Sequence, residues 1–282
     1  VGESGSGKTT VGKAMLNLIK PTSGEVFFNG EKTGITKKEI NEFRQNAQMI
    51  YQDPYQSLNP RNYIMDIVAE PLDVNKLVNT EEERTRRVKE ALEEAGLSPG
   101  EDFFFRYPYE LSGGQRQRVV IASSIIMNPK FIVADEPISM LDASIRTGIL
   151  KLLMKRRDEI GISYLFITHD LSLAWLISDR IAIMYLGTIM EIGTADQIIK
   201  RGIHPYTKAL TAIMPIPGVN RNKKRDVLQG ETPNAGVEIV GCKFCGRCPK
   251  AIEICSKVTP ELKEVEPGHF VACLRYGLDG EL

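Results

Sequence analysis

Along the middle and later parts of the chain, apolar residues follow two alternating patterns. Short apolar runs at 131–134, 163–168 and 181–186 predict buried strands, and residues 143–159 carry apolar side chains at helical spacing. The last run ends at Gly187, where we expect the turn of a hairpin. Strands that alternate with helices are typical of a largely parallel sheet covered by helices, so the pattern predicts an α/β fold.

A helical segment interrupts this alternation. Residues 23–30 predict a short β-rich run, but from Asp53 onward prolines punctuate a loop-rich stretch. Thr80 and Glu83 then form a capping box, and Gly96 follows as a stop signal. The apolar residues between these signals share one helix face: Val88, Ala91, Leu92 and Ala95. We therefore expect an inserted helical subdomain.

These patterns divide the chain into four parts. We expect an α/β core at 1–52 and 128–200, a helical subdomain at 53–127, a linker at 201–240 and a small cysteine-bearing module at 241–282. The linker is marked by Pro215, Pro217 and Gly218 and by a basic run at 221–225, which we interpret as a solvated loop.

Composition narrows the choice of class. The 282 residues include 36 Lys+Arg and 36 Asp+Glu, so no net charge attracts the chain to nucleic acid, and we expect no nucleic-acid partner. The longest apolar runs fall short of the ~20 residues that span a bilayer, and no signal-peptide pattern opens the chain. We expect a soluble or peripheral, intracellular protein. Because all five cysteines lie between Cys242 and Cys273, they suggest metal ligation in a reducing compartment.

The first residues carry a specific chemical motif. Gly2 to Thr9 fit the phosphate-loop spacing Gly-x4-Gly-Lys-Thr. Its glycines let backbone N–H groups converge on phosphate oxygens at a helix N-terminus, Lys8 adds a positive charge, and the Thr9 hydroxyl suits Mg²⁺. The predicted nucleotide contacts are Gly2, Glu3, Ser4, Gly5, Ser6, Gly7, Lys8, Thr9 and Thr10. Because such a loop follows a buried strand and Val1 opens the sequence, we expect a truncated sequence that lacks its first strands.

Two acidic residues end the predicted strand at 131–134. Strand alternation directs the side chains of Asp135 and Glu136 to different sides. Asp135 suits Mg²⁺ ligation, directly or through water. Glu136 suits acceptance of a proton from the water that attacks a γ-phosphate.

The sequence Leu-Ser-Gly-Gly-Gln at 111–115 contains a second helix N-terminus that favours an anion, because Ser112, Gly113 and Gly114 open the helix that we expect here. With this stretch the chain resembles the ATP-binding subunits of ABC transporters, whose signature sequence is LSGGQ. The resemblance implies a P-loop ATPase core with a helical subdomain. It also implies a dimer in which ATP and Mg²⁺ are sandwiched, the signature of one subunit capping the γ-phosphate held by its partner. The signature residues are Ser112, Gly113, Gly114 and Gln115.

The same resemblance implies roles for three further residues. Gln52 corresponds to the Q-loop glutamine near the Mg²⁺ and the attacking water, Asp142 lies in the D-loop, and His169 is the switch histidine that holds the γ-phosphate. The implied catalytic residues are Glu136, His169 and Gln52, and the implied Mg²⁺ ligands are Thr9, Gln52 and Asp135. The family's adenine-stacking aromatic residue would lie in the absent strands.

Residues 51–61 and 204–210 are similar to the oligopeptide/dipeptide importer subfamily, and the cysteine-bearing tail agrees with this branch. In that subfamily four cysteines bind an iron–sulfur cluster. The resemblance nominates four residues for a [4Fe-4S] cluster: Cys242, Cys248, Cys255 and Cys273. The residues alone leave other interpretations open. Cys242, Cys245 and Cys248 before Pro249 form a ferredoxin-like run that makes Cys245 an alternative ligand. Four thiolates equally suit zinc, and free thiols are a further alternative.

Together these motifs predict an ATP-hydrolysing subunit of an ABC importer, peripheral on the cytoplasmic side of the cell membrane. The resemblance implies a second ATPase subunit, with a heterodimer favoured, two membrane permease subunits and, indirectly, an extracytoplasmic solute-binding protein. Peptides are the favoured cargo, with oligosaccharides, nickel and glutathione as alternatives. One alternative function is a soluble ABC ATPase of translation or DNA maintenance, and another is the same subunit with a redox- or metal-sensing tail.

Overall fold

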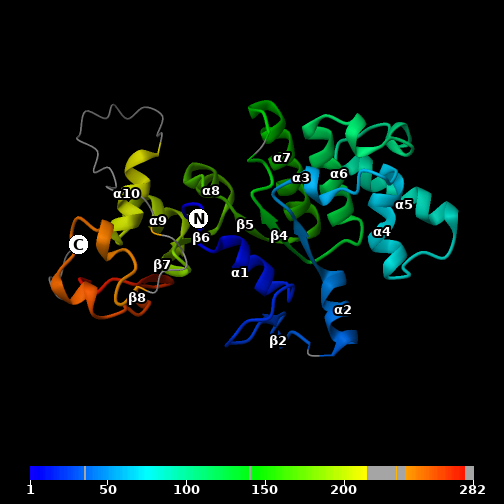
Figure 1. The fold of residues 1–282 in the computed structure, drawn as a ribbon. Helices are drawn as coiled ribbons and strands as arrows, with labels where there is room; N and C mark the ends of the chain where they lie inside the picture. The colour runs from blue at the N-terminus through cyan, green and yellow to red at the C-terminus, as the bar shows by residue number, and fades with distance from the viewer. Residues whose placement is uncertain (35, 140, 215–232, 234–238, 277–282) are drawn as a thin grey trace. The chain divides into compact units, whose positions relative to one another are not determined.

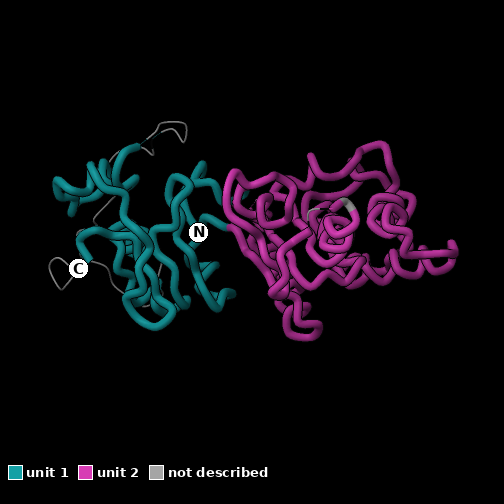
Figure 2. Tube along the Cα trace, turned by 90° about the horizontal axis from the view of Figure 1, so that it is seen from below, with its two compact units in different colours: residues 1–9, 168–282 teal, residues 10–167 magenta. Residues whose placement is uncertain are grey.

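The structure is a computed structural model that describes residues 1–34, 36–139, 141–214, 233 and 239–276 (Figure 1). Its contacts group the chain into two compact units (Figure 2). Unit 1 comprises residues 1–9 and 168–282, and unit 2 comprises residues 10–167. These contact-based units are not the four predicted parts, which stay a prediction. Most of the predicted linker, including Pro215, Pro217, Gly218 and the run 221–225, lies outside the described residues.

Unit 2 is built on a parallel sheet. Strands β3 (Ala47–Ile50), β4 (Phe131–Asp135) and β5 (Ser163–Ile167) pair in that order, with Ile50 opposite Ala134 and Asp135 opposite Ile167. The two strands predicted here from apolar runs are therefore confirmed, and β3 is a third that the patterns missed. The predicted β-rich run contains β1 (Phe27–Phe28), which forms a hairpin with β2 (Glu31–Lys32).

Helices make up most of the remainder of unit 2 (Figure 1). The α-helices are α1 (Lys8–Met15, from Thr10 onward), α2 (Lys37–Asn46), α3 (Pro54–Ser57), α4 (Ile64–Val74), α5 (Glu81–Glu94), α6 (Gly113–Ile125) and α7 (Ala143–Ile160). Two short 3₁₀ helices, η1 (Gly100–Phe103) and η2 (Pro108–Glu110), precede α6. Helices α4, α5 and α6 pack on one another and form the expected helical region.

The predicted signals of helix α5 are confirmed. The Thr80 hydroxyl accepts a hydrogen bond from the backbone N–H of Glu83 at 3.2 Å, which satisfies one of the free donors of the first turn. Val88 and Leu92 are fully buried, and Gly96 ends the helix with φ +80°. Glycine adopts this left-handed backbone conformation without the steric cost that other residues bear.

Helix α1 packs closely on the parallel sheet through a small residue. A Cβ added to Gly12 would lie 2.8 Å from Val133 Cγ1 of β4 and 3.0 Å from Ile167 Cδ1 of β5. These distances are shorter than van der Waals contact, so only glycine lets the helix axis come this near. The approach anchors the helix that follows the phosphate loop on the two strands whose ends carry Asp135 and Thr168.

Unit 1 contains an antiparallel sheet. Strands β6 (Arg180–Tyr185), β7 (Thr188–Thr194), β9 (His269–Val271) and β8 (Lys263–Glu266) pair in that order. The turn between β6 and β7 contains Gly187 with φ +77°, which confirms the predicted hairpin. Helices α8 (Leu171–Ile177), α9 (Ala195–Arg201) and α10 (Pro205–Ile213) and the short η3 (Cys245–Arg247) and η4 (Glu253–Ser256) complete the described elements.

The last part of the chain shares this sheet and its core. Strand β9 pairs with β7, with Glu191 opposite Val271. The Glu191 carboxylate is fully buried and accepts hydrogen bonds from the backbone N–H groups of Ile203 at 2.8 Å and His204 at 2.9 Å. Its Oε1 also lies 2.7 Å from His269 Nε2. One buried carboxylate thus ties β7, β9 and the start of α10 together.

His204, the N-cap of α10, predicts a pH dependence of stability. Its Nδ1 accepts a hydrogen bond from the backbone N–H of Tyr206 at 3.1 Å, and burial lowers the pKa of His204 from 6.5 to about 4. Between these values the unfolded chain binds a proton that the folded chain does not, so stability is full above pH 6.5 and falls as the pH drops towards 4. The linked loss is at most about 3 kcal/mol.

Replacing His204 by Asn keeps a capping acceptor and removes this titration. We expect the free energy of unfolding of His204→Asn, measured by urea titration at several pH values, to fall less steeply below pH 6.5 than that of the parent. Other groups titrate in both proteins, so the difference between the two curves is the quantity to compare. Parallel curves would contradict the assignment.

Candidate nucleotide site

The phosphate loop, residues 2–9, folds within unit 1 against strand β6. The backbone N–H of Met184 donates to the Val1 carbonyl at 2.7 Å, and that of Gly187 donates to the Ser6 carbonyl at 2.9 Å. A Cβ on Gly2 would lie 2.1 Å from the Met184 carbonyl oxygen, so the close approach requires glycine. These contacts hold the beginning and the middle of the loop on β6 and on the turn that follows it.

The loop bends where its glycines allow it. Gly5 and Gly7 have φ values of +76° and +89°, which only glycine adopts without strain. Lys8 Nζ donates to the carbonyls of Gly2 at 2.9 Å and Glu3 at 2.7 Å. The ammonium therefore closes the loop on itself, beside the N-terminus of α1. The phosphate binding that the sequence motif predicts for Lys8 and the N–H groups of this loop stays a prediction.

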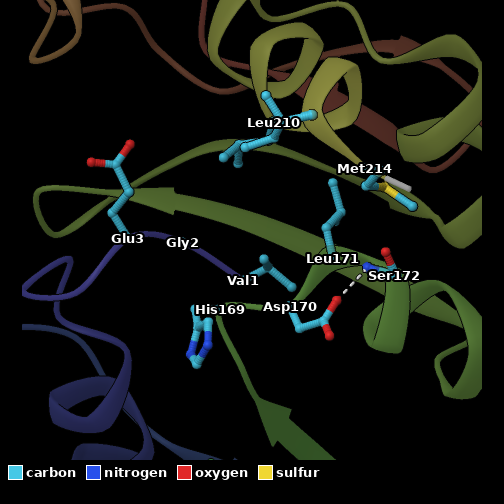
Figure 3. Close-up of a pocket in the computed structure, with 10 residues that line it drawn as sticks. Val1, Gly2, Glu3, His169, Asp170, Leu171, Ser172, Leu210 and Met214 are labelled. Atoms are coloured by element: carbon cyan, nitrogen blue, oxygen red, sulfur yellow. Dashed lines mark hydrogen bonds between the residues drawn. The ribbon is translucent and has the colours of Figure 1, made fainter. Parts of the chain in front are cut away.

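His169 lies near the start of this loop. A cavity of about 310 Å³ is lined by Val1, Gly2, Glu3 and His169, together with Asp170, Leu171, Ser172, Leu210, Ile213 and Met214. Figure 3 shows the Glu3 carboxylate pointing away from the His169 ring. Asp170 Oδ1 caps α8 by accepting from the backbone N–H of Ser172 at 2.9 Å. Residues 4–9 do not line this cavity, so it borders the loop's first residues only.

The end of β4 brings Gln52 and Glu136 together in unit 2. Gln52 Nε2 donates to Glu136 Oε2 at 3.3 Å, and the backbone N–H of Glu136 donates to the Ile167 carbonyl at 2.9 Å. Glu136 has φ +45°, a left-handed backbone value that is strained for a non-glycine residue. Asp135, the preceding residue, is 3% exposed.

The signature residues begin α6 with a reciprocal cap. Ser112 Oγ accepts from the backbone N–H of Gln115 at 3.3 Å, and Gln115 Oε1 accepts from that of Ser112 at 3.0 Å. A Cβ on Gly114 would lie 2.8 Å from Ile145 Cδ1 of α7, so this glycine is needed for helix packing. The cap uses the serine and glutamine side chains locally, and the intermediate exposure of Gly113 leaves backbone accessible at the helix N-terminus.

A contact that sequence reasoning missed links the Gln52 segment to the signature helix. The Arg116 guanidinium carbon lies 4.2 Å from the centroid of the Tyr55 ring, a cation–π distance. Tyr55 follows Gln52 by three residues, and Arg116 follows the signature. A tyrosine and an arginine near two nucleotide motifs are the available sequence signals, but nothing in their spacing predicts that they meet.

The remaining predicted residues are distributed over both units. Asp142 is exposed and is the N-cap of α7, with no side-chain cap hydrogen bond. Its neighbour Met140 lies outside the described residues. Unit 2 holds Thr10, Gln52, Asp135, Glu136, Ser112, Gly113, Gly114, Gln115 and Asp142, whereas unit 1 holds residues 2–9 and His169. The joint role of these residues in one site stays a prediction.

The cysteines lie in unit 1 within electrostatic range of one another. The backbone N–H of Cys242 donates to the Cys255 carbonyl at 2.7 Å. Burial is the main cause that raises the pKa of the Cys242 thiol to about 11, and the neighbouring Cys255, Cys248 and Cys273 contribute in the same direction. Burial and the same kind of neighbours, Cys273 first among them, also raise the pKa of Cys248. Within the described residues, no three His, Cys, Asp or Glu side chains are placed to hold a single metal ion.

Residues outside the predicted set contact the phosphate loop. Arg247 Nη1 donates to Glu3 Oε2 at 2.9 Å, and the Tyr206 hydroxyl accepts from the backbone N–H of Glu3 at 3.3 Å. Lys243 Nζ donates to the Leu186 carbonyl at 2.7 Å. Sequence reasoning treated this region as a separate metal module, so the basic residues between the cysteines received no role.

Comparison with known proteins identifies the family. Residues 1–139 match the ABC transporter family, and residues 190–255 match the C-terminal region of oligopeptide/dipeptide transporters. The chain is 47% identical over 279 residues to YkfD of Bacillus subtilis (98% of this chain, 84% of that protein). It is 43% identical to the oligopeptide transport ATP-binding protein AppF of the same bacterium (98% and 84%) and 44% identical to its oligopeptide transport ATP-binding protein OppF (97% and 84%).

Solved structures agree with the fold. CbiO1 of Clostridium perfringens, part of an ABC transporter complex, superposes with a TM-score of 0.63 at 28% identity, covering 71% of this chain and 78% of that one. A dimeric ATP-binding cassette in a post-hydrolysis state, bound to ADP and Pi, has a TM-score of 0.62 at 34% identity, covering 69% and 83%. The predicted α/β ATPase fold and the predicted ATP-hydrolysing activity are thereby confirmed. The chain belongs to the ABC transporter family, as an ATP-hydrolysing ATP-binding subunit of the oligopeptide/dipeptide type.

Proposed function

We propose that this subunit powers the import of peptides. The proposal is supported by the match of residues 190–255 to the C-terminal region of oligopeptide/dipeptide transporters and by the names of AppF and OppF. Oligosaccharides, nickel and glutathione are the competing cargoes. A nucleotide-binding subunit does not touch its cargo, so its own residues do not choose among them.

The observation that carries the catalytic proposal is the Gln52–Glu136 pair. In this proposal the Glu136 carboxylate accepts a proton from the water that attacks the γ-phosphorus of ATP in line with the leaving oxygen of ADP. The hydrogen bond from Gln52 Nε2, at 3.3 Å, orients that carboxylate. Lys8 and the loop N–H groups bind the β- and γ-phosphates, and His169 donates to the γ-phosphate.

The residues proposed for Mg²⁺ have suitable chemistry. Asp135 and Gln52 offer a carboxylate and an amide oxygen, and Thr9 offers a hydroxyl, all hard oxygen donors of the kind Mg²⁺ prefers. Asp135 is 3% exposed, and a carboxylate so buried is stabilised by hydrogen bonds or a cation. When bound, Mg²⁺ would neutralise charge that develops on the phosphates.

The signature residues are proposed to act on a partner's nucleotide. Ser112, Gly113 and the N-terminus of α6 would cap the γ-phosphate held by the second subunit's loop, with Asp142 at the same interface. The dimeric ADP-bound cassette supports a nucleotide site of this kind. A related rather than identical second subunit is the favoured partner.

An exposed aromatic cluster in unit 2 supports docking to a membrane permease. The ring centroids of Tyr63 and Tyr107 lie 4.6 Å apart, and Tyr107 and Tyr109 stack at 5.3 Å. Phe105 packs edge-on against Tyr63 and is itself 74% exposed. Aromatic side chains gathered on a surface are typical of protein interfaces. We propose that a helix of the permease covers them, which would place the subunit peripherally on the cytoplasmic side of the membrane.

In the described part of the chain, no helix has both the length and the apolar composition that crossing a membrane requires. We propose that the subunit attaches to the membrane through two permease subunits, with an extracytoplasmic solute-binding protein engaged indirectly.

Reconstitution tests the cargo. The subunit would be assembled with its permeases in liposomes, with its solute-binding protein and labelled tri- to hexapeptides supplied outside. We expect peptides to stimulate ATP hydrolysis and to accumulate inside. Stimulation and uptake only with an oligosaccharide, nickel or glutathione would contradict peptide import. A rate of ATP hydrolysis that is the same with and without the permeases would favour a soluble ATPase.

We also propose that four cysteines, Cys242, Cys248, Cys255 and Cys273, hold a [4Fe-4S] cluster. Their thiols share one region of unit 1, where burial and mutual repulsion of their thiolates disfavour ionisation of Cys242 and Cys248. A cationic cluster would relieve that repulsion. The cysteines of such a cluster bind different irons, whereas zinc requires sulfurs that converge on one point.

Two cysteine variants separate the ligand sets. After anaerobic purification, we expect about four irons and four sulfides per chain, retained in Cys245→Ser and lost in Cys242→Ser. Retention in Cys242→Ser with loss in Cys245→Ser would show that Cys245 is the ligand, and stoichiometric zinc would replace the cluster assignment. Transport that responds to iron supply in the parent, but not in a variant with all five cysteines replaced, would indicate a sensing role for the tail.

A further inference from the structure

The segment between the first three cysteines, residues 242–248, forms a compact double turn that we call the cysteine turn. The backbone N–H of Cys245 donates to the Cys242 carbonyl at 2.9 Å, and that of Cys248 donates to the Cys245 carbonyl at 3.2 Å. Phe244, fully buried, anchors the turn, with its ring centroid 5.3 Å from that of Tyr185 and 5.2 Å from that of Tyr206. The turn is thus seated on β6 and α10.

Arg247 of this turn forms an ion pair with the phosphate loop. Its Nη1 donates to both carboxylate oxygens of Glu3, at 2.9 and 3.2 Å, and to the Tyr185 hydroxyl at 3.4 Å. The guanidinium carbon lies 5.7 Å from the centroid of the Tyr185 ring. The side chains of Arg247 and Glu3 are 10% and 28% exposed, so water screens this pair less than it screens surface pairs.

Two further contacts support the loop, one from Tyr206 of α10 and one from Lys243 of the cysteine turn. The Tyr206 hydroxyl accepts from the backbone N–H of Glu3 at 3.3 Å. Lys243 Nζ donates to the Leu186 carbonyl at 2.7 Å, next to Gly187, whose N–H donates to the Ser6 carbonyl. The cysteine turn therefore contacts the start of the loop through Arg247 and supports its middle through the β6–β7 turn.

The position of Glu3 gives this contact an electrostatic consequence. Glu3 places a negative charge inside a loop whose other groups are proposed to bind anionic phosphates. Like charges that lie close together repel strongly where water is excluded. Arg247 pairs with that charge, and the carboxylate points away from His169 (Figure 3). At the same time the Glu3 carbonyl accepts from Lys8 Nζ at 2.7 Å, so displacement of Glu3 would also disturb the loop's lysine.

We propose that Arg247 is a positioning residue for nucleotide binding, which neutralises and orients Glu3 so that the phosphate loop accepts a triphosphate. The proposal rests on the proposed role of the loop. It makes the cysteine-bearing region a part of the nucleotide site's support, rather than an independent appendage.

A double-mutant cycle tests the proposal. We expect Arg247→Met to weaken the binding of a fluorescent anthraniloyl analogue of ATP, and to raise the KM for ATP in the reconstituted importer, by about tenfold, with kcat changed by less than about twofold. Glu3→Gln removes the charge that Arg247 neutralises, so we expect it to weaken nucleotide binding less than Arg247→Met does. The double variant should regain most of the lost affinity, because the neutral amide that replaces the Glu3 carboxylate no longer needs the arginine.

A matched control separates this effect from general destabilisation. Arg201 also joins the body of unit 1 to the C-terminal strands, by an ion pair with Glu266 at 3.1 Å. Arg201→Met should change neither the nucleotide affinity nor the KM by more than about twofold. If Arg247→Met does not fold, as judged by circular dichroism, Arg247→Gln removes the charge and keeps a hydrogen-bond donor, and we expect the same loss of affinity.

Two results would overturn the proposal. The first is parent-like nucleotide affinity in Arg247→Met, or in Arg247→Gln if Arg247→Met does not fold. The second is a double variant that binds nucleotide as weakly as the single Arg247 variant. Lys8→Ala keeps this failure distinct from failure of the proposed function. If the parent binds nucleotide, Lys8→Ala does not, and Arg247→Met binds like the parent, only the role of Arg247 is lost. If the parent itself binds no nucleotide, the function of the loop is lost.

Discussion

Glu136→Gln is expected to lower the kcat of ATP hydrolysis by about 10²- to 10⁴-fold, the range typical of loss of a general base. The amide is nearly the size of the carboxylate and still accepts a hydrogen bond from Gln52, so local geometry should persist, while its basicity is lost. ATP binding should remain within about threefold of the parent, since the change acts on the chemical step. A steady-state assay and an equilibrium binding measurement on the same protein check both values.

The same variant reports on the dimer. Because hydrolysis is blocked, Glu136→Gln should accumulate as a dimer in the presence of ATP and Mg²⁺. Size-exclusion chromatography detects this dimer, which the parent forms only transiently. Glu90→Gln, which alters an exposed carboxylate paired with Arg86 on α5, is the matched control and should leave the rate unchanged. Hydrolysis at the parent rate by Glu136→Gln would remove Glu136 from the role of base.

Lys8→Ala is expected to weaken ATP binding itself. Its ammonium is the point charge of the loop, and truncating one partner of a close charge pair costs about 3 kcal/mol, or roughly a hundredfold in affinity. The loop carbonyls of Gly2 and Glu3 also lose their donor. The dissociation constant for Mg-ATP, measured by equilibrium dialysis, is the readout.

The control for this variant lies on the same helix. Lys13→Ala changes an equal charge about one and a half turns further along α1, and we expect its affinity to stay within about twofold of the parent. A parent-like affinity in Lys8→Ala would contradict the phosphate-binding role of the loop, whatever the rate of hydrolysis.

Local signals in the sequence predicted many elements correctly. Strands β4 and β5, the β6–β7 hairpin and helices α5, α6 and α7 follow from apolar periodicity and from caps such as Thr80 and Ser112, because these features act over a few residues. The parallel order β3-β4-β5 and the pairing of β9 with β7 depend on contacts between distant residues, and no local pattern encodes them.

The candidate site shows the same division. Motif spacing predicts site residues in the phosphate loop, at the end of β4 and in the signature turn, and their roles stay predictions. Spacing does not predict the left-handed conformation of Glu136. It also does not predict the Tyr55–Arg116 contact or the Arg247–Glu3 pair, because these join residues up to 244 positions apart. The cysteines around Arg247 indicate a metal-binding role for the whole segment, and no sequence signal pairs Arg247 with Glu3.

The pairing of β9 with β7 bears on how the protein tolerates shortening. Deleting the chain after Val240 would remove β9 from one side of β7 and leave an open β-edge of the kind that recruits other chains into aggregates. It would also take His269 away from the fully buried Glu191 carboxylate, at a desolvation cost that no new partner offsets. Insolubility of such a shortened product would therefore reflect damage to the ATPase fold, and single substitutions are the safer route to the role of the C-terminal residues.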